Sequence, residues 1–337
     1  MRNKTIALVS VLAMSIVAAT GCAPFAPEKT SSPSQSSQGP AQGDQVADVM
    51  ATTVYVADHN GLVVPLNIKM AQTNAVAKAT LEHMVQGSAG DAAVATTGLH
   101  NVLPSGTQVR GVSINGGVAT VDFSQEVLNY NTLQEEQDIV DAVVWTMTGL
   151  DGVDRVKFRI EGHDRPTMKM GTPIADAISR ASGINLDVAA DVNPSNSTKL
   201  TLYFTGSNPE GNFTYLVPVT RILPKTDANI VDLTMQQLAV GPNQDGLGPV
   251  FASNLKPEKA EVIDNVATLD FGDDFAVNSN TPTVRNMLNS IVLSVTANAG
   301  VDAVQFKVNG EAPVSAEGLG DLSKPVLVPD IINAKEL

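Results

Sequence analysis

Two aspartates, Asp122 and Asp270, stand at the same place in two nearly identical hexapeptides and are the first candidates for chemistry. Two carboxylates can act as general acid and general base when both lie in one cleft. The alternative is that an aspartate at the end of a strand caps a turn or the next helix through local hydrogen bonds. We favour capping, because the duplication described below places the two carboxylates in separate domains.

Other titratable residues show no catalytic or metal-binding spacing. Asp273 and Asp274 follow Asp270 closely, but calcium loops need six to eight oxygens at defined spacing, so these residues indicate a solvated loop. The four histidines show no H-x-H or H-E-x-x-H arrangement. We predict no catalytic residue, no metal and no cofactor. A hydrolase site confined to the first half stays an alternative hypothesis, and its candidate residues are His59, His83, His100 and His163.

The single cysteine, Cys22, excludes a disulfide within the chain and any multi-cysteine metal site. It follows a basic start and an apolar run of 14 residues, Ile6–Ala19. That run is short for a membrane span and typical of a signal-peptide core. The adjoining sequence, Ala19-Thr20-Gly21-Cys22, resembles a bacterial lipobox. We therefore expect a lipoprotein signal peptide at 1–21 and lipid attachment at Cys22, with an ordinary secretory signal as the alternative.

Composition limits the partners of the chain. The segment after Cys22 is rich in Pro, Ser and Gln and has few large apolar residues, which predicts a disordered tether over 22–50. The whole chain of 337 residues carries a formal net charge of −14. Because a phosphate backbone must be neutralised by Lys and Arg, we expect no nucleic-acid binding. Attachment to a membrane would need the lipid and not a basic surface.

The hexapeptides Val118–Phe123 and Val266–Phe271 agree at five of six positions and lie 148 positions apart. The same shift carries Val54–Val56 onto Leu202–Phe204, which indicates a duplicated domain. We place the first copy at 51–165, a linker at 166–197, the second copy at 198–315 and a C-terminal tail at 316–337.

Periodicity predicts the elements that must position the aspartates. Two strands and a helix open each copy, followed by a hairpin, a long helix and a closing strand. In the first copy the hairpin turns at Asn115-Gly116, and Thr132-x-x-Glu135 is a capping box for the long helix. The turn in the second copy is Asp264-Asn265. Each copy is thus predicted as an α+β domain of order β-β-α-β-β-α-β, with one sheet and two helices.

The repeated blocks resemble the GerM domain. In the first copy the resemblance is carried by Val54–Val56, Asn101–Pro104, Val118–Ser124 and Val153–Gly162. In the second copy it is carried by Leu202–Phe204, Asn254–Pro257, Val266–Phe271 and Val301–Gly310. GerM domains are similar to ring-building motifs, the small α+β units that assemble secretion-system rings. A lipobox followed by two such copies resembles the sporulation and germination lipoproteins of endospore-forming bacteria.

This resemblance implies a non-enzymatic structural role. The expected protein supports the channel complex between mother cell and forespore, anchored by its lipid on the extracytoplasmic face of the cell membrane, in the intermembrane space around the forespore. Its expected partners are the membrane and other proteins of that complex, without a small-molecule ligand. The alternative is an extracytoplasmic lipoprotein that binds a solute or the cell wall.

Overall fold

The computed structural model describes residues 49–190, 192–251, 255–275, 277 and 279–334. The predicted signal peptide, Cys22 and nearly all of the predicted tether lie outside the described residues. The first repeat comprises β1 (Val49–Ala57), β2 (Val63–Ala71), α1 (Val76–His83), α2 (Asp91–Val94), β3 (Val109–Asn115), β4 (Val118–Phe123), a 3-10 helix (Gln125–Leu128), α3 (Leu133–Met147), β5 (Arg155–Ile160) and β6 (His163–Asp164).

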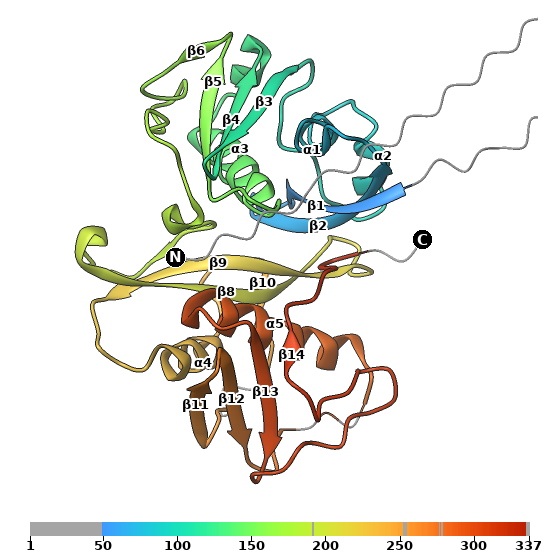
Figure 1. Ribbon diagram of the computed structural model, residues 1–337, viewed down its shortest axis with the longest axis vertical. Coiled ribbons are helices and arrows are strands. Elements are labelled where there is room, and N and C mark those ends of the chain that lie inside the picture. The colour runs from blue at the N-terminus through green and yellow to red at the C-terminus, as the bar shows by residue number, and fades with distance from the viewer. Residues whose placement is uncertain (1–48, 191, 252–254, 276, 278, 335–337) are drawn as a thin grey trace, which may run out of the picture. The chain divides into compact units, whose positions relative to one another are not determined.

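The second repeat follows the same order, after two 3-10 helices and a short strand (Figure 1). These connecting elements are Arg180–Ser182, β7 (Asp187–Val188) and Pro194–Asn196. The second repeat comprises β8 (Ser197–Ser207), β9 (Thr214–Pro224), α4 (Ile230–Val240), β10 (Leu247–Gly248), β11 (Lys259–Ile263), β12 (Val266–Phe271), α5 (Pro282–Ala299), β13 (Ala303–Val308) and β14 (Val326–Leu327).

The tandem α+β architecture is confirmed, but the expectation of one sheet per copy is wrong. In the first repeat β1 and β2 form their own sheet, apart from the sheet β3-β4-β5-β6. The second repeat is divided in the same way, into β10-β8-β9-β7 and β11-β12-β13-β14. On its outer edge β1 bonds a helix instead of another strand at Tyr55, whose N donates to Thr146 Oγ1 of α3 at 2.9 Å. Tyr203 N of β8 donates to Ser294 Oγ of α5 at 3.0 Å in the same manner.

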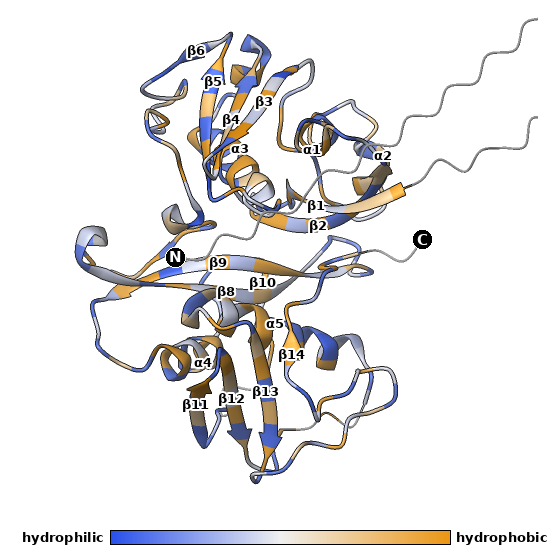
Figure 2. Cartoon of the chain, in the orientation of Figure 1, coloured by the Kyte–Doolittle hydropathy of each residue, from blue (hydrophilic) through white to orange (hydrophobic). Residues whose placement is uncertain are grey.

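The repeated hexapeptides form the central strands β4 and β12. Ala119, Val121 and Phe123 are buried on one face of β4, and the residues between them are half-buried, as the alternation predicts. Figure 2 shows this alternation of hydrophobic and polar residues along the strands. The turn before β4 lies one residue later than predicted, because Gly116 and Gly117 are the two residues with positive φ. In the second repeat the predicted turn is confirmed.

The long helices cross between parallel strands, α3 from β4 to β5 and α5 from β12 to β13. The capping box is confirmed at the start of α3, where Thr132 and Glu135 exchange hydrogen bonds. Thr281 caps α5 by accepting from Val284 N, and Pro282 occupies the first helical position. Each fully buried aliphatic side chain on these helices contributes about 1.5–3 kcal/mol to stability.

Residues 166–197, expected as a linker, pack against the first repeat. Met168, Ile174 and Ile184 are buried. The fully buried carboxylate of Glu136 accepts hydrogen bonds from Tyr130 Oη, Met170 N and Thr172 N. Burial alone would raise the pKa of Glu136, but these donors hold the pKa below its ordinary value. The segment contains a 3-10 turn at 180–182.

The repeats meet where β2 lies beside β9 (Figure 1). Pro65 of β2 stands opposite Tyr55 in its hairpin, and Pro218 of β9 stands opposite Tyr203, so the two prolines occupy equivalent positions. Proline has no backbone N–H and therefore interrupts any ladder that joins β2 to β9 directly. The backbone groups at this junction need other partners.

The side chain of Asn185, from the segment between the repeats, supplies the first partner. Its Oδ1 accepts from Val63 N at 2.8 Å. Its Nδ2 donates to the carbonyl oxygens of Val63 at 2.8 Å and Pro218 at 2.7 Å. One carboxamide thus bridges β2 of the first repeat and β9 of the second.

Asn333, from the C-terminal segment, forms the second bridge. Its Oδ1 accepts from Leu216 N at 2.7 Å, and its Nδ2 donates to the carbonyl oxygens of Leu216 at 2.8 Å and Pro65 at 2.7 Å. Leu216 and Val63 each lie two residues before the equivalent prolines, so the two asparagine bridges are related by an approximate two-fold axis. The C-terminal segment also adds β14 to the edge of β13.

Candidate functional site

Asp122 and Asp270 cap turns, as the capping interpretation predicts. Asp122 Oδ1 accepts from Gly162 N at 2.8 Å, and Asp270 Oδ1 accepts from Gly310 N at 2.9 Å. Both glycines have positive φ in tight turns after the neighbouring parallel strand. The capping interpretation predicts local hydrogen bonds, but the turns lie 40 residues further along the chain. The two aspartates lie in different sheets and do not form one site.

The histidines are spread over several elements. His100 forms an isolated antiparallel β-bridge with Ala57, the last residue of β1. His59 follows Ala57 by two residues in the sequence. His83 ends α1, and His163 lies in β6. Burial lowers the pKa of His100, and the nearby Asp58 partly offsets that shift. Within the described ranges, no group of three or more His, Cys, Asp and Glu side chains is arranged to hold a metal ion.

Asp273 and Asp274 are exposed, consistent with a solvated loop. Asp273 Oδ1 accepts from the side chain of Asn309 at 2.7 Å. Cys22, the predicted lipid-attachment residue, lies outside the described residues. No helix in the part of the chain that the structure describes combines the length and apolarity needed to cross a membrane.

The first repeat has a groove of about 1040 Å³ between β1, β3 and the start of α1. We call it the β1–β3 groove. Residues just after α3 and residues of the C-terminal segment also line it. Its lining is largely apolar but also contains the charged residues Lys78, Asp151 and Asp330. The apolar lining residues are Met50, Ala51, Ala75, Val76, Ala77, Val112, Ile114, Leu150 and Ile331. An apolar groove beside edge strands is suited to an extended polypeptide.

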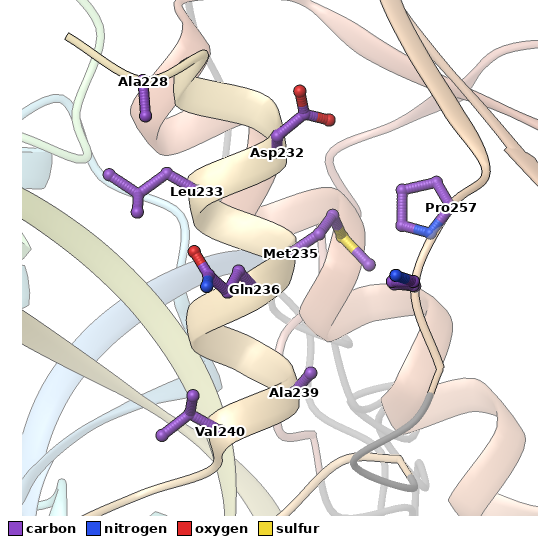
Figure 3. Close-up of a pocket in the computed structure, with 9 residues that line it drawn as sticks. Ala228, Asp232, Leu233, Met235, Gln236, Ala239, Val240 and Pro257 are labelled. Carbon is purple, nitrogen blue, oxygen red and sulfur yellow. The ribbon is translucent and has the colours of Figure 1, made fainter.

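The second repeat has a smaller groove of about 570 Å³ beside α4. In Figure 3, Met235 and Ala239 point toward Pro257, whereas Leu233 and Val240 lie on the other side of the helix. Val240, the last residue of α4, is 64% exposed. Each repeat therefore has an apolar groove beside its first helix, with different lining residues.

Two carboxyls on α3, Asp138 and Asp141, have raised pKa values. Burial raises the pKa of Asp138 to about 6, against a hydrogen bond from Gln134 that lowers it. Burial, and then the neighbouring Asp138, raise the pKa of Asp141 to about 7. The 148-residue shift places asparagines at both equivalent positions in α5, Asn286 and Asn289. The second repeat thus carries uncharged side chains where the first carries acids.

We expect Asp141→Asn to stabilise the chain at pH 8 and to leave stability unchanged near pH 4. In the unfolded chain an aspartate ionises near pH 4, whereas folded Asp141 keeps its proton until about pH 7. Stability of the unmodified chain therefore falls as pH rises through this window. Thermal midpoints measured from pH 4 to pH 8 test this expectation. Asp227→Asn, at an exposed aspartate, is the control, and a pH-independent effect of Asp141→Asn would contradict the prediction.

Comparison with known proteins agrees with the duplicated architecture. A family model described as "Germane: Sporulation and spore germination" matches residues 53–165 and again residues 201–313. The spore germination protein GerM of Bacillus subtilis (strain 168) is 34% identical over 299 residues, which cover 87% of this chain and 81% of that protein.

A solved structure is also similar. The tandem GerMN domains of the sporulation protein GerM from Bacillus subtilis superpose with a TM-score of 0.74 at 33% sequence identity. The match covers 84% of this chain and 99% of the solved one. The two family matches span both repeats, and the solved tandem has the same fold. The chain therefore belongs to the Germane family of sporulation and spore germination proteins.

Proposed function

We propose that this sporulation and germination protein acts without catalysis, as a lipid-anchored structural factor in the assembly of an extracytoplasmic protein complex. The observation that carries the proposal is the junction of the repeats. Asn185 and Asn333 fasten the two domains through six hydrogen bonds, so that their surfaces face a partner as one unit. A fixed arrangement of two domains suits an assembly role, because less freedom is lost on binding.

The complex we propose is the channel between mother cell and forespore. The resemblance to ring-building motifs supports this assignment, as does the spore germination protein to which the chain is similar. The chain would then lie on the outer face of the cell membrane, held by a lipid on Cys22. Its partners would be the membrane and other proteins of the channel.

Substitution of Cys22 by serine tests the proposal. We expect the unmodified protein to incorporate a labelled fatty acid in sporulating cells and Cys22→Ser not to incorporate it, because a thioether-linked lipid cannot form on serine. We also expect Cys22→Ser to lower the yield of spores, since the assembly factor is no longer held by its lipid. A Cys22→Ser protein that still incorporates the fatty acid would overturn the anchoring, and a normal spore yield would overturn its role in assembly.

A second candidate function is a lipoprotein that binds a solute or the cell wall. The two apolar grooves favour it, because ligand sites are concave and largely apolar. Thermal midpoints measured with soluble peptidoglycan fragments separate the two functions. A saturable rise in the midpoint supports cell-wall binding, and an unchanged midpoint argues against it.

A further inference from the structure

The outer edge of β1 presents alternate backbone groups to the β1–β3 groove. In an antiparallel pair, every second residue points its N–H and C=O away from the partner strand. Ala57 uses these outward groups to bond His100, and Tyr55 N uses its own to bond Thr146. The next outward residue is Thr53, which lines the groove. Its N–H and C=O are therefore directed at the groove.

The second repeat shows what pairs with this position. Thr201 lies at the equivalent place in β8, 148 residues after Thr53. Thr201 N donates to Asn298 Oδ1 at 2.8 Å, and Asn298 Nδ2 donates to the carbonyl oxygen of Thr201 at 2.9 Å. A carboxamide at the end of α5 thus meets the strand edge with one acceptor and one donor. A peptide group of an added strand has the same pair of functions.

The first repeat lacks this carboxamide. The residue equivalent to Asn298 is Leu150, whose side chain offers no hydrogen bond and lines the groove. Among the described residues, none forms a hydrogen bond with the outward N–H or C=O of Thr53. The same backbone position is therefore closed by an amide in one repeat and open to a groove in the other.

The walls of the groove suit a polypeptide more than a small polar solute. β3 is the edge strand of its sheet, and Ile114 on it is 49% exposed. Ile331 on the opposite rim is 55% exposed. Ala75, the N-cap residue of α1, makes no side-chain hydrogen bond to the start of the helix. The first backbone N–H groups of α1 are therefore not capped by this residue. Apolar side chains beside free backbone donors match the alternating chemistry of an extended strand.

The groove is also continuous with the junction of the repeats. The C-terminal segment that forms its rim continues to Ile332, whose carbonyl oxygen accepts from Asn67 N of β2 at 3.2 Å. The next residue is Asn333, the second asparagine bridge. A polypeptide in the groove would therefore extend an existing surface at which β-strand edges of this chain already bind extended segments.

We propose that the β1–β3 groove binds an extended segment of a partner protein in which apolar side chains alternate, and whose peptide group pairs with Thr53 as the Asn298 carboxamide pairs with Thr201. This inference deepens the proposed function and rests on it in one respect, that the protein works by binding other proteins. It assigns the binding to the first repeat alone. The second repeat is closed at the equivalent position by its own asparagine.

Substitution of Leu150 tests the site with a matched pair of variants. Leu150→Asn places a carboxamide at the position equivalent to Asn298, where we expect it to bond the backbone of Thr53. Leu150→Ala removes at least as many apolar atoms without supplying an amide. The probe is a fluorescein-labelled heptapeptide of alternating threonine and valine with blocked ends. It is titrated into the full chain carrying Cys22→Ser in detergent micelles, and its polarisation is measured.

We expect saturable binding to the chain with Leu150 and slower hydrogen exchange at the Thr53 amide when the peptide is bound. We expect Leu150→Asn to bind the peptide at least about tenfold more weakly than Leu150→Ala, with thermal unfolding showing that both variants are folded at the temperature of the titration. Equal affinities of the two variants, protection in β8 instead of β1, or no binding would each overturn the proposal. Because the experiment needs neither lipid nor sporulating cells, its failure is distinct from a failure of membrane anchoring.

Discussion

Replacing Arg221 by alanine is expected to destabilise the second repeat by about 3–5 kcal/mol, because the substitution leaves a buried carboxylate with only a neutral partner, the side-chain amide of Asn243. Arg221 lies in β9 with a side chain only 2% exposed. Its Nε donates to Asp187 Oδ2 at 2.7 Å, and the carboxylate of Asp187 is itself 9% exposed. Alanine would remove the positive charge and leave Asp187 in a site that water reaches poorly.

Further partners add to this effect. Arg221 Nη2 donates to the carbonyl oxygen of Gly241 at 2.7 Å, at the end of α4. Nη1 donates to the side chain of Gln237 at 3.1 Å, and the guanidinium lies 5.6 Å from the ring centre of Phe204. One side chain thus joins β7, β9 and the end of α4. Lysine cannot reproduce these directed bonds, so Arg221→Lys is expected to restore only part of the stability.

Denaturation by urea, followed by circular dichroism, measures the loss. The matched control is Arg159→Ala, which removes an ion pair with Asp164 whose partners are 45% and 50% exposed. Exposed pairs contribute at most about 1 kcal/mol, so this variant should unfold close to the unmodified chain. A midpoint for Arg221→Ala that equals that of Arg159→Ala would show that the buried network contributes little.

The double substitution Asn185→Ala and Asn333→Ala is expected to uncouple the two repeats. Each bridge removed leaves backbone groups of the buried residues Val63 and Leu216 without partners, at a cost of about 1–3 kcal/mol for each group left unpaired. The core of each repeat is untouched. We therefore expect one calorimetric transition in the unmodified chain. We expect two in the double variant, one for each repeat.

Both asparagines have positive φ, and alanine in that conformation adds strain of about 1–2 kcal/mol at each site. Asn309 controls for this effect, because it also has positive φ but lies in a turn within the second repeat. Asn309→Ala should lower the transition temperature without dividing the transition. If the double variant also unfolds in one step, the asparagine bridges do not couple the domains.

Much of the local structure follows from the sequence, because local rules determine it. The capping box at Thr132 and Glu135 needs only neighbouring residues, and the faces of Val118–Phe123 follow from a period of two. The division of each repeat into two sheets does not follow. It depends on Thr146 and Ser294, helix residues whose hydroxyls bond strand edges 91 residues away. A hydroxyl within a helical pattern carries no signal of that long-range partner.

The candidate site and the junction also depend on residues that are distant in sequence. Asn185 and Asn333 stand in segments that composition indicates as a linker and a tail, and their partners are 33 to 268 residues distant. The difference between Leu150 and Asn298 is visible once the repeats are aligned, but its meaning requires the strand edge that Asn298 bonds. For Asp122 and Asp270, the sequence predicts the capping role but not the turns that they cap.

The two asparagine bridges also stand at opposite ends of the second repeat. Asn185 precedes the whole second repeat in sequence, and Asn333 follows its last strand. Every strand of both repeats precedes Asn333, so each core can form without the second bridge. The junction then closes as an encounter between two folded bodies on one chain. Its rate is therefore independent of protein concentration, unlike that of a dimer with the same two-fold contact.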